Sequence, residues 1–394
     1  MGLSEKSTAQ ALQIALLFTA MFSSMGGPAL APALPAIKTA YQTIPDIEFW
    51  TKVLVAITGL FSAVGAPLFG WFSDRYGRKS ALISALFLWA LAGVSGMIPQ
   101  SFWTLLAGRA LLGLGLGGLL VANTAMIADS YSKDKQRYMM GMQSSFASSG
   151  IVLSLIISGL LTDIHWRWAF SIFLSGFMIL PFAFLSPEPA PRQQTVVQHA
   201  LPPFVYLIIL CFFAFSTMMV FNVIPTQLPF FMIRTGIIKT ASAIGLALAV
   251  MPVASAVAGR LYARVSRHMN LWNLFMVGGA LMLSGFYMIS LSNGLTGLLF
   301  SLVFIGIGFG TTMPHLNIVL THIVPPQARG RVMGMMTSAK FIGLFVSPFV
   351  FQPLLSAFGY HTILRIAGGF IFFAAFVIWT LRFRYVKDKK RGLL

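Results

Sequence analysis

Residues 111–120 read Leu-Leu-Gly-Leu-Gly-Leu-Gly-Gly-Leu-Leu and lie inside an apolar run that extends from 102 to 128. A helix of about 20 apolar residues crosses the ~30 Å hydrocarbon core of a bilayer. The alternating glycines of this run return 193 residues later as Gly306, Gly308 and Gly310. The stretch therefore predicts a membrane-spanning helix in a chain whose two halves repeat each other.

Other residues follow the same repeat. Gly141 and Gly150 are matched by Gly334 and Gly343, and the loop with Gly70, Arg75 and Arg78 is matched by one with Gly259, Arg264 and Arg267. Several matches at nearly one spacing indicate a duplicated six-helix unit. Repeats of this kind place a solute site between the halves near the middle of the bilayer and move by alternating access.

The composition is that of a membrane protein. Hydrophobic residues make up 57% of the 394 positions and charged residues only 9%, whereas a soluble domain has about 25% charged residues. Apolar runs predict twelve spans, near 11–35, 50–73, 80–98, 102–128, 137–161, 167–186, 204–232, 240–262, 270–291, 295–322, 332–356 and 360–383. The predicted fold is an all-α polytopic membrane protein with two pseudo-symmetric six-helix bundles.

The most polar interruption in mid-chain runs from Ser186 to Pro203 and is rich in Pro and Gln. It is short enough to be a linker. It predicts an N-terminal bundle over 1–186, a cytoplasmic linker over 187–203 and a C-terminal bundle over 204–394. The first apolar stretch lacks a basic leader and a small-residue cleavage site, so we expect it to be retained as a helix.

The net charge of +18 follows from topology. With both termini on the cytoplasmic side, most of the 27 Lys and Arg residues fall in cytoplasmic loops, as the positive-inside rule requires. The basic residues therefore indicate an orientation and give no reason to expect a nucleic-acid partner. We expect a multi-pass protein of the bacterial inner membrane, acting as a monomer in the lipid bilayer.

Enzyme chemistry has no support in the sequence. Cys211 is the one cysteine, so no disulfide or cysteine-based metal site forms within one chain. The glycine rows lie inside apolar spans with no preceding strand and no following Lys-Ser or Lys-Thr, unlike phosphate-binding loops. Without a metal-ligand cluster or a nucleophile–base pair, we expect no cofactor, no metal and no enzymatic activity.

The loop after the second span, residues 70–79, reads Gly-Trp-Phe-Ser-Asp-Arg-Tyr-Gly-Arg-Lys. Its candidate functional residues are Gly70, Asp74, Arg75, Gly77, Arg78 and Lys79, extended by Asp129 and Arg137 after the fourth span. Gly70 would permit close helix approach, Gly77 a tight turn, and Asp74 would pair with Arg78 or with a helix terminus. The alternative is a plain cationic anchor.

This loop resembles the signature G-x-x-x-D-R-x-G-R-[KR] of the major facilitator superfamily, in which the cluster latches the cytoplasmic side while the protein faces outward. Arg109 to Gly115 resembles the motif R-x-x-x-G-x-G of its drug-antiporter branch. The resemblance covers the whole chain and is greatest to the 12-helix drug:proton antiporters of the Bcr/CflA type. The antiporter motif of span five, G-x-x-x-G-P-x-x-G-G, is reduced to Gly150-Ile-Val-Leu-Ser154-Leu155-Ile-Ile-Ser158-Gly159 without its proline.

Two cations are predicted inside spans, Arg109 and Lys340, while every Asp and Glu falls in a loop or at a span end. A charged side chain at the bilayer centre costs roughly 2.5–3.5 kcal/mol on insertion scales. A natural counter-ion is the substrate, which predicts an electropositive cavity and an anionic or zwitterionic solute. The alternatives are that Arg109 bonds carbonyls of neighbouring helices and that Lys340 extends to the cytoplasm.

A proton carrier is expected because a histidine titrates near neutral pH. His315 lies at a depth that suits this role, and a structural histidine is the alternative. Other candidates are Asp74, Asp129 or Arg109 exchanging partners with the substrate.

Further lining candidates are polar or soft side chains within the spans. They are Gln143, Asn222, Gln227, Asn317, Phe341 and Met25. Asn222 and Gln227 flank Pro225, and helices break where backbone lines a cavity. Each of these side chains is alternatively explained by packing between helices.

Together these features predict a secondary transporter of a small amphipathic solute. The resemblance implies proton-coupled export of a drug, siderophore-like compound or metabolite. The reduced antiporter motif and the cationic spans leave import of an organic anion, by symport or uniport, as the alternative.

Overall fold

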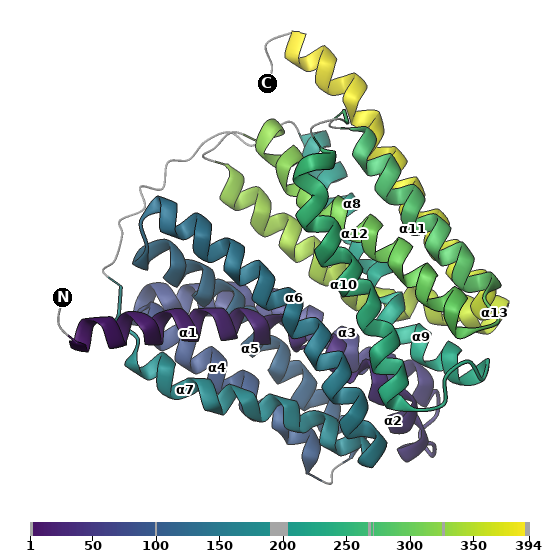
Figure 1. Ribbon diagram of the computed structural model, residues 1–394, viewed down its shortest axis with the longest axis horizontal. Helices are drawn as coiled ribbons and strands as arrows, with labels where there is room; N and C mark the ends of the chain where they lie inside the picture. Colours follow the sequence, from purple (N-terminus) through teal and green to yellow (C-terminus); the bar gives the residue numbers. More distant parts are fainter. Residues whose placement is uncertain are drawn as a thin grey trace. The chain divides into compact units, whose positions relative to one another are not determined.

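The structure is a computed structural model that describes residues 3–98, 101–189, 204–266, 269–270, 272–324 and 328–390. The described residues form helices and no strands. In the first half these are α1 Leu3–Met25, η1 Pro28–Ala33, α2 Leu34–Ala40, α3 Ile47–Tyr76, α4 Arg78–Val94, η2 Ser95–Met97, α5 Phe102–Ser130, α6 Lys133–Ile164, η3 Trp166–Leu174 and α7 Ser175–Leu185. In the second half they are α8 Phe204–Phe221, α9 Val223–Arg234, α10 Ala241–Val265, α11 Asn273–Leu291, α12 Leu295–Ile323 and α13 Arg329–Lys390 (Figure 1).

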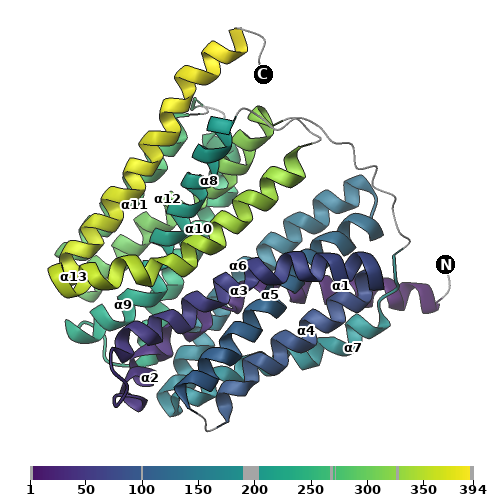
Figure 2. The ribbon, with the colours of Figure 1, turned by 180° about the vertical axis from the view of Figure 1, so that it is seen from behind.

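The predicted all-α membrane fold is confirmed. Eleven stretches are long and apolar enough to cross a membrane among the described residues. The eleventh, Arg331–Arg384, holds both predicted spans 332–356 and 360–383. Gly359 separates them with a φ of 75°, a left-handed conformation that glycine adopts without strain. Figure 2 shows the two parts of α13, yellow-green and yellow, meeting at this bend.

Two predicted spans are shorter or more broken than expected. The span predicted over 11–35 ends as an α-helix at Met25, and the chain continues as the 3₁₀ helix η1. Pro28 and Pro32 lie in η1, and proline in a helix interior removes a backbone hydrogen bond. The span predicted over 204–232 breaks at Asn222, between α8 and α9.

The chain forms two compact units. The first contains Met1–Gln194 and Thr240–Leu246, and the second contains Thr195–Lys239 and Ala247–Leu394. In the first unit α5 packs on α3 and α4, and α1 packs on α6; in the second, α13 packs on α8 and α11, and α11 on α12. Of the predicted linker 187–203, residues 190–203 lie outside the described part of the chain.

The glycine row of α5 sets the spacing of the first unit. A Cβ on Gly113 would lie 2.6 Å from the Thr58 carbonyl oxygen of α3, and one on Gly117 would lie 2.3 Å from that of Ser62. A Cβ on Gly115 would lie 2.7 Å from the Trp89 amide nitrogen of α4. Alternate glycines of α5 thus lie directly against the backbones of two different helices.

The matching row of α12 does the same in the second unit. A Cβ on Gly306 would lie 2.4 Å from the Met251 carbonyl oxygen of α10, and one on Gly308 would lie 2.6 Å from that of Gly278 in α11. The repeat that the sequence predicts is therefore present in the helix packing. Small residues let membrane helices approach closely in this way.

Replacing Gly117 by Ala should destabilise the protein by about 1–3 kcal/mol, the usual cost of overpacking, because a rigid carbonyl would meet the new methyl. Gly141→Ala is the matched control, since no atom lies within 4 Å of a Cβ there. Thermal unfolding in detergent should show a lower midpoint for Gly117→Ala alone. Equal midpoints for the two variants would contradict the packing role of the row.

Candidate functional site

The candidate latch begins at the turn between α3 and α4. Gly77 separates the two helices with a φ of 95°, and its amide donates to the Ser73 carbonyl oxygen at 3.1 Å. A residue with a Cβ is strained in this conformation. The turn thus places the first residue of α4, Arg78, beside the last turn of α3.

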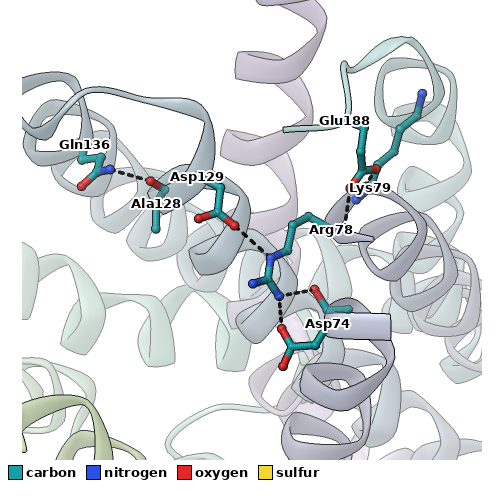
Figure 3. A network of polar contacts seen from close by, with 8 residues as sticks. Asp74, Arg78, Lys79, Ala128, Asp129, Gln136 and Glu188 are labelled. Carbon is teal, nitrogen blue, oxygen red and sulfur yellow. Dashed lines mark hydrogen bonds and ion pairs between the residues drawn. The ribbon is translucent and has the colours of Figure 1, made fainter. Parts of the chain in front are cut away.

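Arg78 joins three helices through its guanidinium. Nη1 donates to Asp74 Oδ1 at 2.6 Å and to Ser73 Oγ at 2.9 Å, and Nε donates to Asp129 Oδ2 of α5 at 2.9 Å (Figure 3). The contacts predicted for Asp74 and Asp129 are both present. The side chain of Asp74 is 71% exposed and that of Asp129 is 6% exposed, so water screens the Asp74 pair far more strongly.

Glu188 is a member of this network that the sequence analysis did not single out. Its Oε1 accepts from the Arg78 amide at 2.7 Å, and its Oε2 accepts from the Lys79 amide at 3.1 Å. A carboxylate at the first turn of a helix satisfies free amides and interacts favourably with the helix dipole. Glu188 thus ties the segment after α7 to the start of α4, as Figure 3 shows.

The rest of the loop motif lies outside the network. Arg75 lies over the rings of Trp71 and Tyr76, at 5.7 Å from each centroid. A Cβ on Gly70 would meet Val121 at an ordinary 3.8 Å, so the close approach expected there is not found. The side chain of Arg137 is outside the described part of the structure.

Arg109 is buried in α5 with 1% of its surface exposed. Its Nη2 donates to the Gly26 carbonyl oxygen, and its Nε donates to that of Leu54 at 3.3 Å. The guanidinium also lies 5.7 Å from the centre of the Phe173 ring. These contacts agree with the alternative stated for Arg109, in which it bonds carbonyls of neighbouring helices. The buried Nη1, however, has no hydrogen-bond partner.

A second buried cation in the first unit was not expected. Lys52 in α3 has no exposed surface, and its Nζ lies 3.0 Å from Glu48 Oε1. Lys38 Nζ lies 2.6 Å from Glu48 Oε2. The sequence predicts Arg109 and Lys340 as the embedded cations, because Lys52 comes near the start of a span.

The remaining first-unit candidates have simpler surroundings. Met25 is 3% exposed and ends α1, next to the Gly26 carbonyl that Arg109 binds. Gln143 is half-buried in α6.

In the second unit the polar candidates lie on three helices. Asn222, at the break between α8 and α9, donates from Nδ2 to the Leu344 carbonyl oxygen of α13 at 2.9 Å. Gln227 is 1% exposed, and both polar atoms of its amide lack a partner. Lys340 and Phe341 are half-buried in α13, and Asn317 is exposed on α12.

His315 is buried in α12 and is paired with a tyrosine. Its Nδ1 lies 2.7 Å from the hydroxyl oxygen of Tyr262 in α10, and its ring centre lies 4.6 Å from that of Phe275 in α11. Tyr262 was not predicted, because no local pattern links it to a residue 53 positions away. The pair connects α10 to α12 through one hydrogen bond.

The coupling free energies between Arg78 and its two carboxylate partners, Asp74 and Asp129, should differ. Double-mutant cycles with Arg78→Gln should give less than about 1 kcal/mol for the exposed Asp74 pair and about 1.5–3 kcal/mol for the Asp129 pair, which is a charge-assisted bond to a buried carboxylate. Thermal or denaturant unfolding of the Asp74→Asn and Asp129→Asn series measures both. A larger coupling for Asp74 would refute the exposure argument.

Comparisons with known proteins agree with this architecture. The chain has a TM-score of 0.78 to a bacterial homologue of the human lysosomal transporter Spinster in an inward-facing conformation, at 18% identity over 97% of this chain and 98% of that one. It has a TM-score of 0.78 to the xylose transporter XylE from E. coli in an inward-open conformation, at 16% identity over 95% of each chain.

Relatives by sequence include multidrug resistance proteins named MdtG. The protein from Salmonella choleraesuis is 25% identical over 84% of this chain and 85% of its own length. That from Proteus mirabilis is 34% identical over 38% of this chain and 37% of its own length. The sequence profile of the Major Facilitator Superfamily matches residues 16–348. With most of the chain matched and the helical fold in agreement, this multi-pass membrane protein belongs to the Major Facilitator Superfamily of transporters.

Proposed function

We propose that this transporter exports a small amphipathic solute, anionic or zwitterionic, in exchange for protons, as a monomer in a bacterial inner membrane. Membership of the superfamily and the MdtG relatives support export of a small molecule. The negative charge proposed for the solute rests on Arg109, a buried guanidinium that binds two carbonyls and keeps Nη1 unpaired. Among the described residues it has no carboxylate partner.

A buried cation without a counter-ion is costly, because burial removes the water that stabilises its charge. Carbonyl oxygens carry only partial charges and neutralise Arg109 in part. Lys340 of the second unit is half-buried, and no carboxylate lies within 4.0 Å of its ammonium group among the described residues. A solute with a carboxylate, sulfonate or phosphate group would neutralise the charge of either cation.

The Tyr262–His315 pair is the proposed proton carrier. A neutral His315 can accept the tyrosine proton at Nδ1, whereas a protonated His315 must donate there. If the neutral ring carries its proton at Nε2, protonation at Nδ1 forces the tyrosine hydroxyl to turn toward another acceptor, which changes the hydrogen bond between α10 and α12. This links the charge of one side chain to the packing of two helices.

Proton-coupled or uncoupled import is the second candidate. The observation in its favour is that Leu155 stands where the antiporter motif of the resembling group has its proline. The direction of proton movement distinguishes the two candidates.

Purified protein in proteoliposomes under an imposed pH gradient tests the direction. An amphipathic aromatic carboxylate should accumulate inside acid-loaded vesicles, since protons leaving the vesicles would drive the solute in. His315→Gln should keep solute exchange and lose its dependence on the gradient, because glutamine does not titrate. Accumulation with the reverse gradient would establish symport instead. Equal accumulation at all gradients would remove His315 from this role.

The role of Arg109 is tested by Arg109→Gln with two substrates, an aromatic carboxylate and its neutral amide. We expect binding of the carboxylate to weaken about tenfold or more, in line with a lost charge-assisted bond, while the amide is bound as before. Arg382→Gln is the control, since it removes a cation that lies over Trp379 near the end of α13. Equal loss for both substrates would leave Arg109 with a packing role only.

A further inference from the structure

The second unit carries a group of basic side chains beside the bend of α13. His361 Nδ1 lies 2.7 Å from the Ser290 carbonyl oxygen, and Arg365 Nε donates to Ser290 Oγ at 2.9 Å. His361 and Arg365 are one helical turn apart, so they share a face of α13. One serine in the last turn of α11 therefore holds both side chains in place.

Aromatic rings surround these side chains. The Arg365 guanidinium lies 5.3 Å from the centre of the Tyr287 ring of α11. Arg234, in the last turn of α9, lies 5.2 Å from that of Tyr360, and the ring of Phe231 lies 5.6 Å from that of His361. Contacts thus connect Arg234, His361 and Arg365 into one group, which we term the bend cluster.

The sequence around this cluster is poor in carboxylates. No Asp or Glu occurs between Glu188 and Asp388, and the four ion pairs among the described residues all lie in the first unit. The contacts of Arg365 use only Nε and the face of the guanidinium. Among the described residues, neither of its Nη groups has a hydrogen-bond partner that would prevent it from binding an anion.

Topology does not explain this cluster. With the C-terminus on the cytoplasmic side, as the sequence predicts, Arg382 lies near the cytoplasmic end of α13, about 25 Å further along the helix than Arg365 by helix rise. Arg234 and Arg365 belong to the opposite ends of their helices, where the positive-inside rule favours few cations. A ligand is a better reason for three basic side chains at this place.

We propose that the bend cluster binds the phosphate of an anionic phospholipid. Exposed apolar side chains stand next to the polar ones along the chain: Ile233 before Arg234, Leu291 after Ser290 and Ile366 after Arg365, with exposed fractions of 42%, 55% and 37%. A phosphate bound to Arg365 and His361 would place its acyl chains along these residues. Free phosphate would leave that surface uncovered, which favours the lipid.

Native mass spectrometry of the purified full chain tests the proposal. Phosphatidylglycerol is titrated against phosphatidylcholine with the same acyl chains, and soluble glycerol 3-phosphate is added as a competitor. We expect preferential binding of phosphatidylglycerol that the soluble phosphate displaces poorly. The affinity should fall about fivefold with Arg365→Gln, since each Lys or Arg near a membrane surface contributes about that much. It should fall further in the double variant with His361→Gln, which alters a second side chain of the proposed site.

Lys239→Gln is the matched control, because Lys239 is exposed and follows Arg234 by five residues without belonging to the cluster. It should leave the affinity unchanged. Arg234→Gln, which removes no contact to Ser290, repeats the test if Arg365→Gln unfolds in detergent without added lipid. Equal binding of the two lipids, equal losses in the control and cluster variants, or full displacement by glycerol 3-phosphate would each overturn the proposal.

Discussion

The hydrocarbon around this chain offers no hydrogen-bond partner, and this constraint determines both its helices and the position of its charges. Each backbone amide must bond within a helix, so close packing depends on residues without side chains. The glycine rows of α5 and α12 meet that need, because carbonyl and amide atoms of neighbouring helices occupy the space of each missing Cβ. The spacing of four other helices follows from these two rows.

The same constraint separates the two units by charge. In the first unit, Asp74, Asp129 and Glu188 surround Arg78, and Glu48 lies between Lys38 and Lys52. In the second half, Ala263 occupies the position that corresponds to Asp74 in the repeat. No Asp or Glu occurs between Glu188 and Asp388, and the second unit holds basic side chains on aromatic rings, a serine and a tyrosine. Duplication preserved the backbone packing, while the ionic contacts diverged.

Features that repeat or extend along the chain were predictable from the sequence. Apolar runs predicted the helices. Gly306 of α12 and Gly113 of α5 repeat in the sequence because a backbone atom of a neighbouring helix lies too close to each for a side chain. Contacts that depend on a distant backbone atom were not predictable. Glu188 binds two amides, which leave no side-chain pattern, and Tyr262 meets His315 only after α10 and α12 pack together. The break at Asn222 was suggested by Pro225, but its position depends on the bond to Leu344.

Arg78 and Arg109 are the same type of side chain in two different surroundings, and their contacts differ accordingly. Arg78 lies at a helix end, where two carboxylates and a serine use its nitrogens, so its charge is neutralised within the protein. Arg109 lies among apolar residues, and only carbonyl oxygens accept from it. Because a carbonyl satisfies a donor without neutralising a charge, Arg109 can hold α1, α3 and α5 together and still attract an anion. Helix packing and the proposed anion binding are therefore compatible for this residue, since the carbonyls use Nε and Nη2 and leave Nη1 without a partner.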